Sequence, residues 1–243
     1  MSALLEVVGL QKRFGAIVVA DDVTFSLESG HCLGMIGPNG AGKSSVFNLI
    51  AGTIAPDGGT IRFDGRDLGG VASHLRARRG IVRAFQIPQP FPHLTVYENV
   101  LAAASFGAGR SGSQAQTAAL DVLATMGLVA KAEVLAGQLP LLDRKRLELG
   151  KAVASRAKLL LLDEIAAGLT EPEVEDLVAL IATLKTSHAI IWIEHIPHAL
   201  RAVADRILVL HFGRNVLEGP PADVMTSLLV REIYMGFRAD DVA

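Results

Sequence analysis

Residues 37–44 read Gly-Pro-Asn-Gly-Ala-Gly-Lys-Ser, and this octapeptide constrains the fold more than any other part of the chain. The spacing Gly-x-x-x-x-Gly-Lys-Ser is typical of a loop that binds phosphate between a strand and a helix. Its glycines permit backbone conformations in which successive N–H groups turn toward an anion. We therefore predict a buried strand over 31–36 and a helix over 45–51, which begins near Lys43 and directs its positive dipole end at the same anion.

The polar side chains of this loop predict a nucleoside triphosphate bound with Mg²⁺. Lys43 supplies a positive charge for the β- and γ-phosphates, and the Ser44 hydroxyl suits Mg²⁺. The alternative, a glycine-rich turn that matches by chance, does not account for the strand and helix patterns on either side. The residues predicted to contact the nucleotide are Gly37, Pro38, Asn39, Gly40, Ala41, Gly42, Lys43, Ser44 and Ser45.

The composition limits where such a chain can act. Half of its 243 residues are hydrophobic, yet no apolar run approaches the roughly 18–20 residues that a membrane span needs. The first residues lack the basic and long apolar regions of a signal peptide. A net charge of −2 gives no broad electrostatic case for nucleic acid. We expect a cytosolic chain with no nucleic-acid partner, whose excess apolar surface partly covers a sheet and partly faces another protein.

The hydrophobic pattern predicts an α/β fold. Strand patterns occur at 4–10, 17–27, 60–65 and 81–85, with a turn at 13–15, and they return at 159–162, 189–193 and 207–210. A helix with a proline in its first turn is expected over 171–187, between two of the later strands. Continuous apolar strands that alternate with helices indicate a parallel sheet covered on both faces.

A long helical stretch interrupts this alternation. The periodicity is helical from Thr95, which can cap a helix with Glu98 three residues later, to about Ser155. We interpret this stretch as an inserted subdomain. The predicted organisation is a single domain over 1–243, with a β/α core of 1–86 and 156–243 and a helical subdomain of 87–155.

A second motif follows the first of the later strands. Four leucines, 159–162, lead directly into Asp163 and Glu164. Ligands bind at the carboxyl edge of open α/β sheets, so both carboxylates are expected near the nucleotide. Asp163 suits Mg²⁺, directly or through water, because this hard cation prefers oxygen ligands. Glu164 suits the general base that orients and deprotonates an attacking water.

Together these motifs make the chain similar, over nearly its full length, to the ATP-binding subunits of ABC transporters. The resemblance implies a P-loop NTPase core with an antiparallel β edge and the inserted helical subdomain, with ATP and Mg²⁺ as cofactors. It implies that Phe14 stacks on adenine, that Gln86 senses Mg²⁺ and the attacking water, and that His195 contacts the γ-phosphate. The predicted catalytic residues are then Glu164, His195 and Gln86, and the predicted metal ligands are Ser44, Gln86 and Asp163.

One segment departs sharply from the family pattern. Family members carry Leu-Ser-Gly-Gly-Gln before a helix, and this chain carries Leu-Pro-Leu-Leu-Asp at 139–143. In the family this segment binds the γ-phosphate held by the opposite subunit of a dimer. Pro140 has neither a hydroxyl nor an N–H, and Leu141 and Leu142 put side chains where close backbone approach is needed. With Asp143 adding negative charge near a polyphosphate, we expect weaker closure and hydrolysis at the site that this segment faces.

Within the family, the resemblance is to ATPase subunits of importers for branched-chain amino acids and related amides. It is carried by Phe85-Gln86, by residues 163–169, by Glu194-His195 and by the tail at 230–236. It implies ATP-driven solute uptake at the cytoplasmic face of the cell membrane, through separate transmembrane permease subunits and, indirectly, a solute-binding protein. The loop of Gln86 and the helical subdomain would receive the permease, with Phe91, Leu94, Val96 and Tyr97 as candidate contacts.

Other functions remain open at this point. A soluble ABC ATPase of DNA repair, translation or cofactor assembly would be favoured by coiled-coil insertions or a second cassette, and the sequence has neither. A regulatory nucleotide-binding subunit with weak hydrolysis is motivated by 139–143, whereas Glu164 and His195 argue against it. A small-molecule P-loop kinase would not explain why Gln86, Glu164 and His195 occur together at these positions. The second ATPase subunit can be identical or different. The resemblance favours a different one, because importers of this kind commonly use two distinct ATPase subunits.

Overall fold

A mostly parallel, six-stranded sheet forms the centre of the molecule. The computed structural model describes residues 3–235, and its central sheet has the strand order β10-β9-β3-β8-β7-β6. The strands are β3 (Cys32–Ile36), β6 (Ile81–Ala84), β7 (Leu159–Asp163), β8 (Ala189–Ile193), β9 (Arg206–His211) and β10 (Arg214–Gly219). All neighbours are parallel except β10, which runs antiparallel to β9. The predicted parallel sheet is therefore confirmed.

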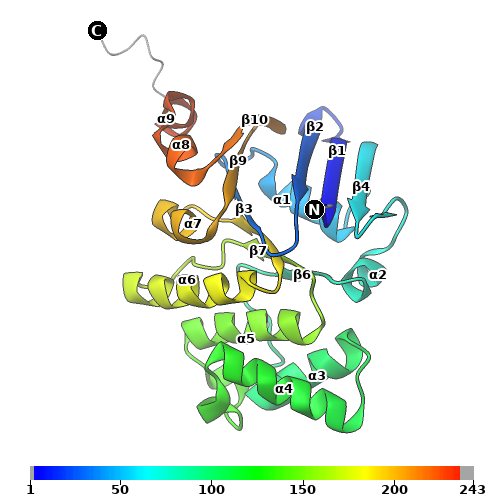
Figure 1. The fold of residues 1–243 in the computed structure, drawn as a ribbon, viewed down its shortest axis with the longest axis vertical. Helices are drawn as coiled ribbons and strands as arrows, with labels where there is room; N and C mark the ends of the chain where they lie inside the picture. Colours follow the sequence, from blue (N-terminus) through cyan, green and yellow to red (C-terminus); the bar gives the residue numbers. More distant parts are fainter. Residues whose placement is uncertain (1–2, 236–243) are drawn as a thin grey trace.

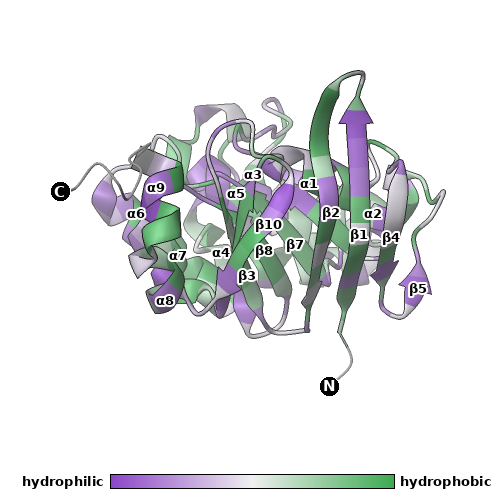
Figure 2. Ribbon diagram, turned by 90° about the horizontal axis from the view of Figure 1, so that it is seen from above, coloured by the Kyte–Doolittle hydropathy of each residue, from purple (hydrophilic) through white to green (hydrophobic). Residues whose placement is uncertain are grey.

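A second sheet, fully antiparallel, accounts for the predicted antiparallel part of the fold. Its order is β2-β1-β4-β5, with β1 (Leu5–Phe14), β2 (Ile17–Leu27), β4 (Gly58–Phe63) and β5 (Arg66–Asp67). Figures 1 and 2 show it to one side of the central sheet, with α1 (Lys43–Ala51) nearby. The turn predicted at 13–15 is shifted, because β1 continues through Phe14 and the chain reverses at residues 15 and 16.

Alternating side chains of the central strands build two hydrophobic cores, one on each face. Leu160 and Trp192 point into the core shared with most of the helices. Leu159 and Ile191 point into the core shared with the antiparallel sheet and α1. Strands β7 and β8 are buried at every residue, as expected for strands covered on both faces. Figure 2 shows these central strands as hydrophobic.

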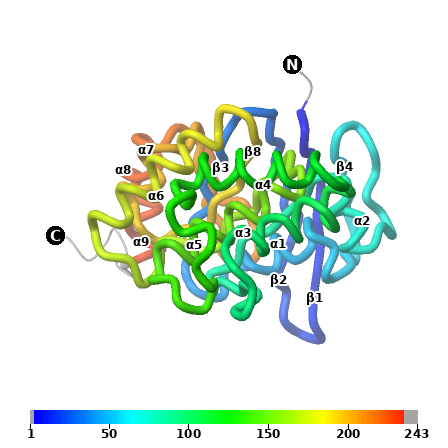
Figure 3. Tube along the Cα trace, turned by 90° about the horizontal axis from the view of Figure 1, so that it is seen from below, coloured from blue at the N-terminus to red at the C-terminus, as the bar shows by residue number. Residues whose placement is uncertain are grey.

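The helical region gathers at one end of the molecule, as Figures 1 and 3 show. It contains α3 (Val96–Ala102), a π-helical turn (Ala103–Gly107), α4 (Gly112–Met126), 3-10 turns (Val129–Lys131 and Ala136–Gln138) and α5 (Leu141–Ala154). The predicted cap is confirmed, because the Glu98 amide donates to Thr95 Oγ1 over 3.1 Å and the Thr95 amide donates to Glu98 Oε2 over 2.7 Å. Val96 is fully buried, so its prediction as a partner contact is wrong.

The helical region shares its hydrophobic core with the central sheet. Apolar residues of α3, α4 and α5 belong to the same buried cluster as those of β7, β8 and β9. This continuity favours a subdomain that folds with the core over an independent domain. The boundaries at 87 and 155 remain our proposal.

The remaining helices cover the central sheet or connect its strands. They are α2 (Ser73–Arg78), α6 (Glu171–Lys185), α7 (Pro197–Val203), α8 (Pro221–Thr226) and α9 (Leu228–Met235). Only α6 was predicted, and it has a capping box and a proline in its first turn. Within residues 3–235, no helix combines the length and the apolar character needed to cross a membrane.

Arg76 on α2 anchors the end of α1, the helix that follows the phosphate loop. Only 3% of this residue is exposed. Its guanidinium donates to the carbonyls of Leu49 and Ile50 over 2.8 and 3.0 Å, and to those of Leu68 and Val71 over 2.9 Å each. The last carbonyls of a helix lack the amide donor of a following turn, and Arg76 supplies donors to two of them in α1.

We predict that Arg76→Met lowers the free energy of unfolding by about 3 kcal/mol, because it removes four hydrogen bonds from a buried guanidinium to backbone carbonyls. Urea denaturation measures this change. Arg78→Met is the matched control, because Arg78 is exposed on the same helix, and it should change stability by less than about 0.5 kcal/mol. Equal stability of the two variants would contradict the anchoring role of Arg76.

Candidate active site

The glycines of the 37–44 loop are required by their positive φ angles and, at Gly37 and Gly42, also by the lack of space for a side chain. Gly37, Gly40 and Gly42 have φ angles of 154°, 81° and 103°. A Cβ atom at Gly37 would lie 2.2 Å from the Leu210 carbonyl oxygen, and one at Gly42 would lie 2.2 Å from that of Val19. The loop therefore packs its backbone against β9 and β2, and α1 begins directly after it at Lys43. This is the strand–loop–helix arrangement that the sequence predicts.

Lys43 folds over the loop and is 6% exposed. Its Nζ atom donates to the carbonyl oxygens of Gly37 over 2.6 Å and of Pro38 over 3.1 Å. Burial lowers the pKa of Lys43, whereas the nearby carboxylates of Glu164 and Asp163 raise it. The positive charge therefore lies between the loop and the end of β7, where an anion bound by the loop would meet it.

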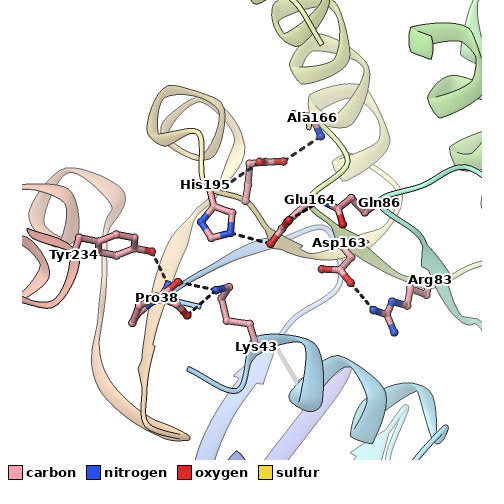
Figure 4. Close-up of polar contacts among 11 residues, drawn as sticks. Pro38, Lys43, Arg83, Gln86, Asp163, Glu164, Ala166, His195 and Tyr234 are labelled. Carbon is pink, nitrogen blue, oxygen red and sulfur yellow. Dashed lines mark hydrogen bonds and ion pairs between the residues drawn. The ribbon is translucent and has the colours of Figure 1, made fainter. Parts of the chain in front are cut away.

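The first residue of the loop is also held by the C-terminal helix. The Gly37 amide donates to the hydroxyl of Tyr234 on α9 over 2.6 Å. Figure 4 shows the Tyr234 ring directed at the loop beside Pro38. Sequence reasoning assigned Tyr234 no role beyond its place in the 230–236 tail, whose last residue lies outside the described part of the chain. No local pattern could have revealed this contact, because its partners are 197 positions apart.

Glu164 lies at the centre of the predicted catalytic residues (Figure 4). Gln86 Nε2 donates to Glu164 Oε2 over 2.8 Å. His195 Nε2 forms a hydrogen bond of 2.8 Å with Glu164 Oε1. The three residues follow β6, β7 and β8, whose carboxyl ends lie side by side in the sheet. The structure thus brings together the three residues predicted to act in catalysis.

Asp163 ends β7 and is paired with a residue that sequence reasoning missed. Its carboxylate forms an ion pair with Arg83 on β6. Arg83 also donates to the side-chain oxygen of Asn48 on α1 over 2.7 Å, and its guanidinium carbon lies 5.0 Å from the Phe85 ring centroid. Arg83 therefore links the carboxylate end of β7 to the helix that follows the phosphate loop.

The site fits a nucleoside triphosphate with Mg²⁺. Ser44 lies in the first turn of α1. Asp163 is close enough to Lys43 that its negative charge raises the pKa of the Lys43 ammonium, against the larger lowering by burial. Within residues 3–235, no cluster of three His, Cys, Asp or Glu side chains could hold a metal ion. Mg²⁺ is usually bound by one or two carboxylates together with substrate phosphates, and Asp163 could supply such a carboxylate.

Phe14, predicted to stack on adenine, is accessible at the end of β1. It is 51% exposed, and Lys12 Nζ lies 5.3 Å from its ring centroid. Strand β2, which follows the same hairpin, touches the phosphate loop where the Val19 carbonyl lies beside Gly42. The hairpin therefore presents an exposed aromatic ring on the strand pair that borders the loop.

The structure changes the interpretation of residues 139–143. Asp143 is only 5% exposed, and its carboxylate forms an ion pair with Lys131 and lies 3.8 Å from a guanidinium nitrogen of Arg146. The expectation that it brings free negative charge toward a polyphosphate is therefore wrong. Leu142 is buried in the core, so only Leu141 of the two leucines remains partly exposed at the start of α5.

Comparison with known proteins identifies relatives over almost the whole chain. The family model described as "ABC transporter" matches residues 20–167. The high-affinity branched-chain amino acid transport ATP-binding proteins BraF of Pseudomonas aeruginosa and LivG of Escherichia coli K12 are each 36% identical, covering 96% of this chain and 98% of theirs. The lipopolysaccharide export system ATP-binding protein LptB of E. coli K12 is 29% identical with the same coverage.

Solved structures show the same architecture. A nucleotide-free ATP-binding cassette from an ABC transporter superposes with a TM-score of 0.87 at 27% identity, covering 97% of this chain and 100% of that one. The ADP conformation of an ATP-binding cassette gives the same TM-score and identity, with 98% and 100% covered. These likenesses confirm the predicted fold class and the resemblance on which it was based.

We predict that Lys43→Ala weakens ATP binding by at least about tenfold, because it removes a charge-assisted hydrogen bond to phosphate. Calorimetric titration of the purified chain measures the change. Lys158→Ala is the control, because Lys158 pairs with Asp64 at a half-exposed position, and it should leave ATP affinity unchanged. Equal affinities of the wild type and Lys43→Ala would exclude the loop as the nucleotide site.

A second prediction follows from the buried position of Asp143. Asp143→Asn should destabilise the fold by about 1–2 kcal/mol, because it leaves Lys131 and Arg146 without their shared carboxylate. Urea unfolding gives this value. Asp176→Asn removes the exposed carboxylate that also binds Arg146 and should have almost no effect. An Asp143→Asn protein of wild-type stability with faster ATP hydrolysis would restore the idea that Asp143 repels phosphate.

Proposed function

This chain belongs to the ABC transporter family, and on that premise we propose that it powers the uptake of branched-chain amino acids or related amides. The chain is an ATP-binding ATPase. The observation that carries the choice of solute is the greater identity to BraF and LivG than to the export protein LptB. We place the chain at the cytoplasmic face of the cell membrane, where separate permease subunits would hold it.

In the proposed reaction, Glu164 is the general base. It accepts a proton from the attacking water while Gln86 and His195 orient its two carboxylate oxygens. Lys43 and the loop amides bind the phosphates. Mg²⁺, when bound, neutralises charge on the phosphate oxygens, and the residues proposed to hold it are Ser44, Gln86 and Asp163.

The proposed permease contact is a groove between the central sheet and the helical region. Its volume is about 490 Å³, and its walls come from β6, α3, the π-helical turn and α5. Two aromatic rings on this surface are strongly exposed, with Phe91 at 56% and Phe106 at 84%. An apolar groove with exposed aromatic residues suits a helix of a membrane subunit. A solute-binding protein would act on the permease and would not touch this chain.

The alternatives fit the site and the relatives less well. A regulatory subunit with weak hydrolysis does not explain the contacts of Gln86 and His195 with Glu164. A DNA-repair or assembly role is less well supported, because BraF, LivG and LptB, which match 96% of the chain, are named for transport or export.

The proposed function is tested by uptake and by crosslinking. Cells that lack this chain should lose high-affinity uptake of leucine, isoleucine and valine, or of a related amide. Phe106→Cys should crosslink to a membrane subunit when membranes that contain the assembled transporter are treated with a short bifunctional thiol reagent. The native Cys32 does not compete, because it is buried and burial raises the pKa of its thiol to about 12.

Val8→Cys is the control for this crosslink. Val8 is exposed on β1 of the antiparallel sheet and should give no product with a membrane subunit. Crosslinks from residue 106 to soluble proteins alone would favour the DNA-repair or assembly role. Normal amino-acid and amide uptake without the chain would overturn the proposed solute.

We also propose an unequal dimer with a second, different ATPase subunit. Helix α5 begins at Leu141, directly after Pro140, which supplies no cap from its side chain. Where the family segment has a serine and two glycines, this chain has Pro140, Leu141 and Leu142. In the dimer this segment would face the ATP that is bound by the partner. The ATP held by Lys43 and Glu164 would face the intact segment of the partner.

This arrangement predicts little ATP hydrolysis by the purified chain alone, and a strong increase when the second ATPase subunit is added. A coupled assay of phosphate release over a range of subunit ratios measures the effect. Full activity of the chain alone would instead support a homodimer that closes through the backbone amides of Leu141 and Leu142.

A further inference from the structure

Two buried, charged side chains lie directly behind the residues that hold Glu164. Gln86 and His195 reach Glu164 from loops after β6 and β8. A side chain on a loop is placed accurately only where the backbone of that loop is held. Lys145 and Glu194 hold the backbone in these two places.

Lys145 holds the loop of Gln86. It lies on α5 and is 3% exposed. Its Nζ atom donates to the carbonyl oxygen of Gln86 over 3.2 Å. Among residues 3–235, it forms no ion pair with a carboxylate. Burial lowers the pKa of Lys145, and the negative charge of Glu194 raises it.

Glu194 joins the segment of His195 to the segment of Glu164. It is 2% exposed. Its Oε1 atom accepts a hydrogen bond from the His195 amide over 3.0 Å, and its Oε2 atom accepts one from the Ala166 amide over 3.2 Å. The Glu164 amide donates to the Ile193 carbonyl over 2.9 Å in the same place. Backbone and side-chain contacts thus close a ring between the ends of β7 and β8.

Stability alone is a weak reason for these charges. Removing a charge from water costs several kcal/mol, and a well-packed apolar side chain often serves stability equally well. A charge on the donor or the acceptor strengthens a hydrogen bond, so a charged side chain holds a backbone group more firmly than a neutral one would. Glu194 accepts one amide on each of its two oxygens, whereas a glutamine would present an NH2 donor to one of these two amides.

We propose that Lys145 and Glu194 are positioning residues for hydrolysis. They hold the backbone at Gln86 and His195, whose side chains form hydrogen bonds with Glu164. Lys145 also ties the site to the helical region, since it lies on α5 two residues after the altered segment 139–143. Movement of α5 is thereby passed to the Gln86 loop. The proposal rests on the proposed role of Glu164 as the base.

The experiment compares Lys145→Met and Glu194→Gln with the wild type in the transporter complex isolated from membranes through a tag on this chain. Each variant should lower kcat for ATP hydrolysis by about tenfold or more, because small misplacements of catalytic groups have large effects on rate. KM for ATP, and the ATP affinity of the isolated chain, should stay within about twofold, because neither residue contacts the phosphate loop. Lys145→Arg, which keeps a charged donor, should recover most of the activity.

Two matched controls separate positioning from general stability. Lys185→Met removes a lysine that donates to the Val203 carbonyl over 3.0 Å, away from the site. Glu173→Gln alters a carboxylate that accepts a backbone hydrogen bond from Thr170 over 2.8 Å. Both should keep the wild-type kcat. Glu194→Gln preserves size and shape, so it tests the proposal even where Lys145→Met does not fold.

Normal kcat in both site variants, or an equal loss in the controls, would overturn the positioning role. A parallel fall of kcat and ATP affinity would also overturn it, because it would show a general structural defect. Failure of the proposed base is distinct: Glu164→Gln would then keep full turnover whatever the result for Lys145 and Glu194.

Discussion

The hydrogen bonds that fix the carboxylate of Glu164 are the interaction on which the rest of the site depends. Gln86 holds one oxygen and His195 the other, each over 2.8 Å. The backbone of Glu164 has a φ of 47°, a left-handed conformation that is uncommon for a residue with a side chain. Such strain persists only where the surroundings enforce it. Here the enforcement comes from the amide of Glu164, which donates to Ile193 on β8.

The topology of the central sheet makes this arrangement possible. Strands β6, β7, β8 and β3 are neighbours and parallel, so their carboxyl ends meet along one edge. Each end supplies one part of the site: Gln86, Glu164, His195 and the 37–44 loop. The helical region enters through α5, whose lysine side chain reaches the Gln86 carbonyl. One edge of one sheet therefore joins the 37–44 loop, the carboxylate proposed as the base and the surface proposed for the permease.

Local patterns in the sequence were enough to predict the strand, loop and helix around residues 37–44. They also predicted the two carboxylates, Asp163 and Glu164, at the end of the strand of leucines 159–162. Gln86 and His195 needed the family resemblance, because a single glutamine or histidine has no diagnostic pattern. Contacts between distant parts of the chain could not be predicted at all. Arg83 meets Asp163 across 80 positions, and Tyr234 meets Gly37 across 197. The expectation for the charge of Asp143 failed for the same reason. Its partner Lys131 lies in the 3-10 turn Val129–Lys131, before α5, and the sequence does not reveal that the two side chains meet.

The central claim is that Glu164, held by its two neighbours, is the base for ATP hydrolysis. The most direct measurement is single-turnover hydrolysis by the Glu164→Gln transporter complex, alongside equilibrium binding of ATP. The account predicts ATP affinity within about threefold of the wild type and hydrolysis slower by roughly 10²-fold or more, because glutamine keeps the shape but cannot accept the proton. Hydrolysis at the wild-type rate would contradict it, and another residue would have to activate the water.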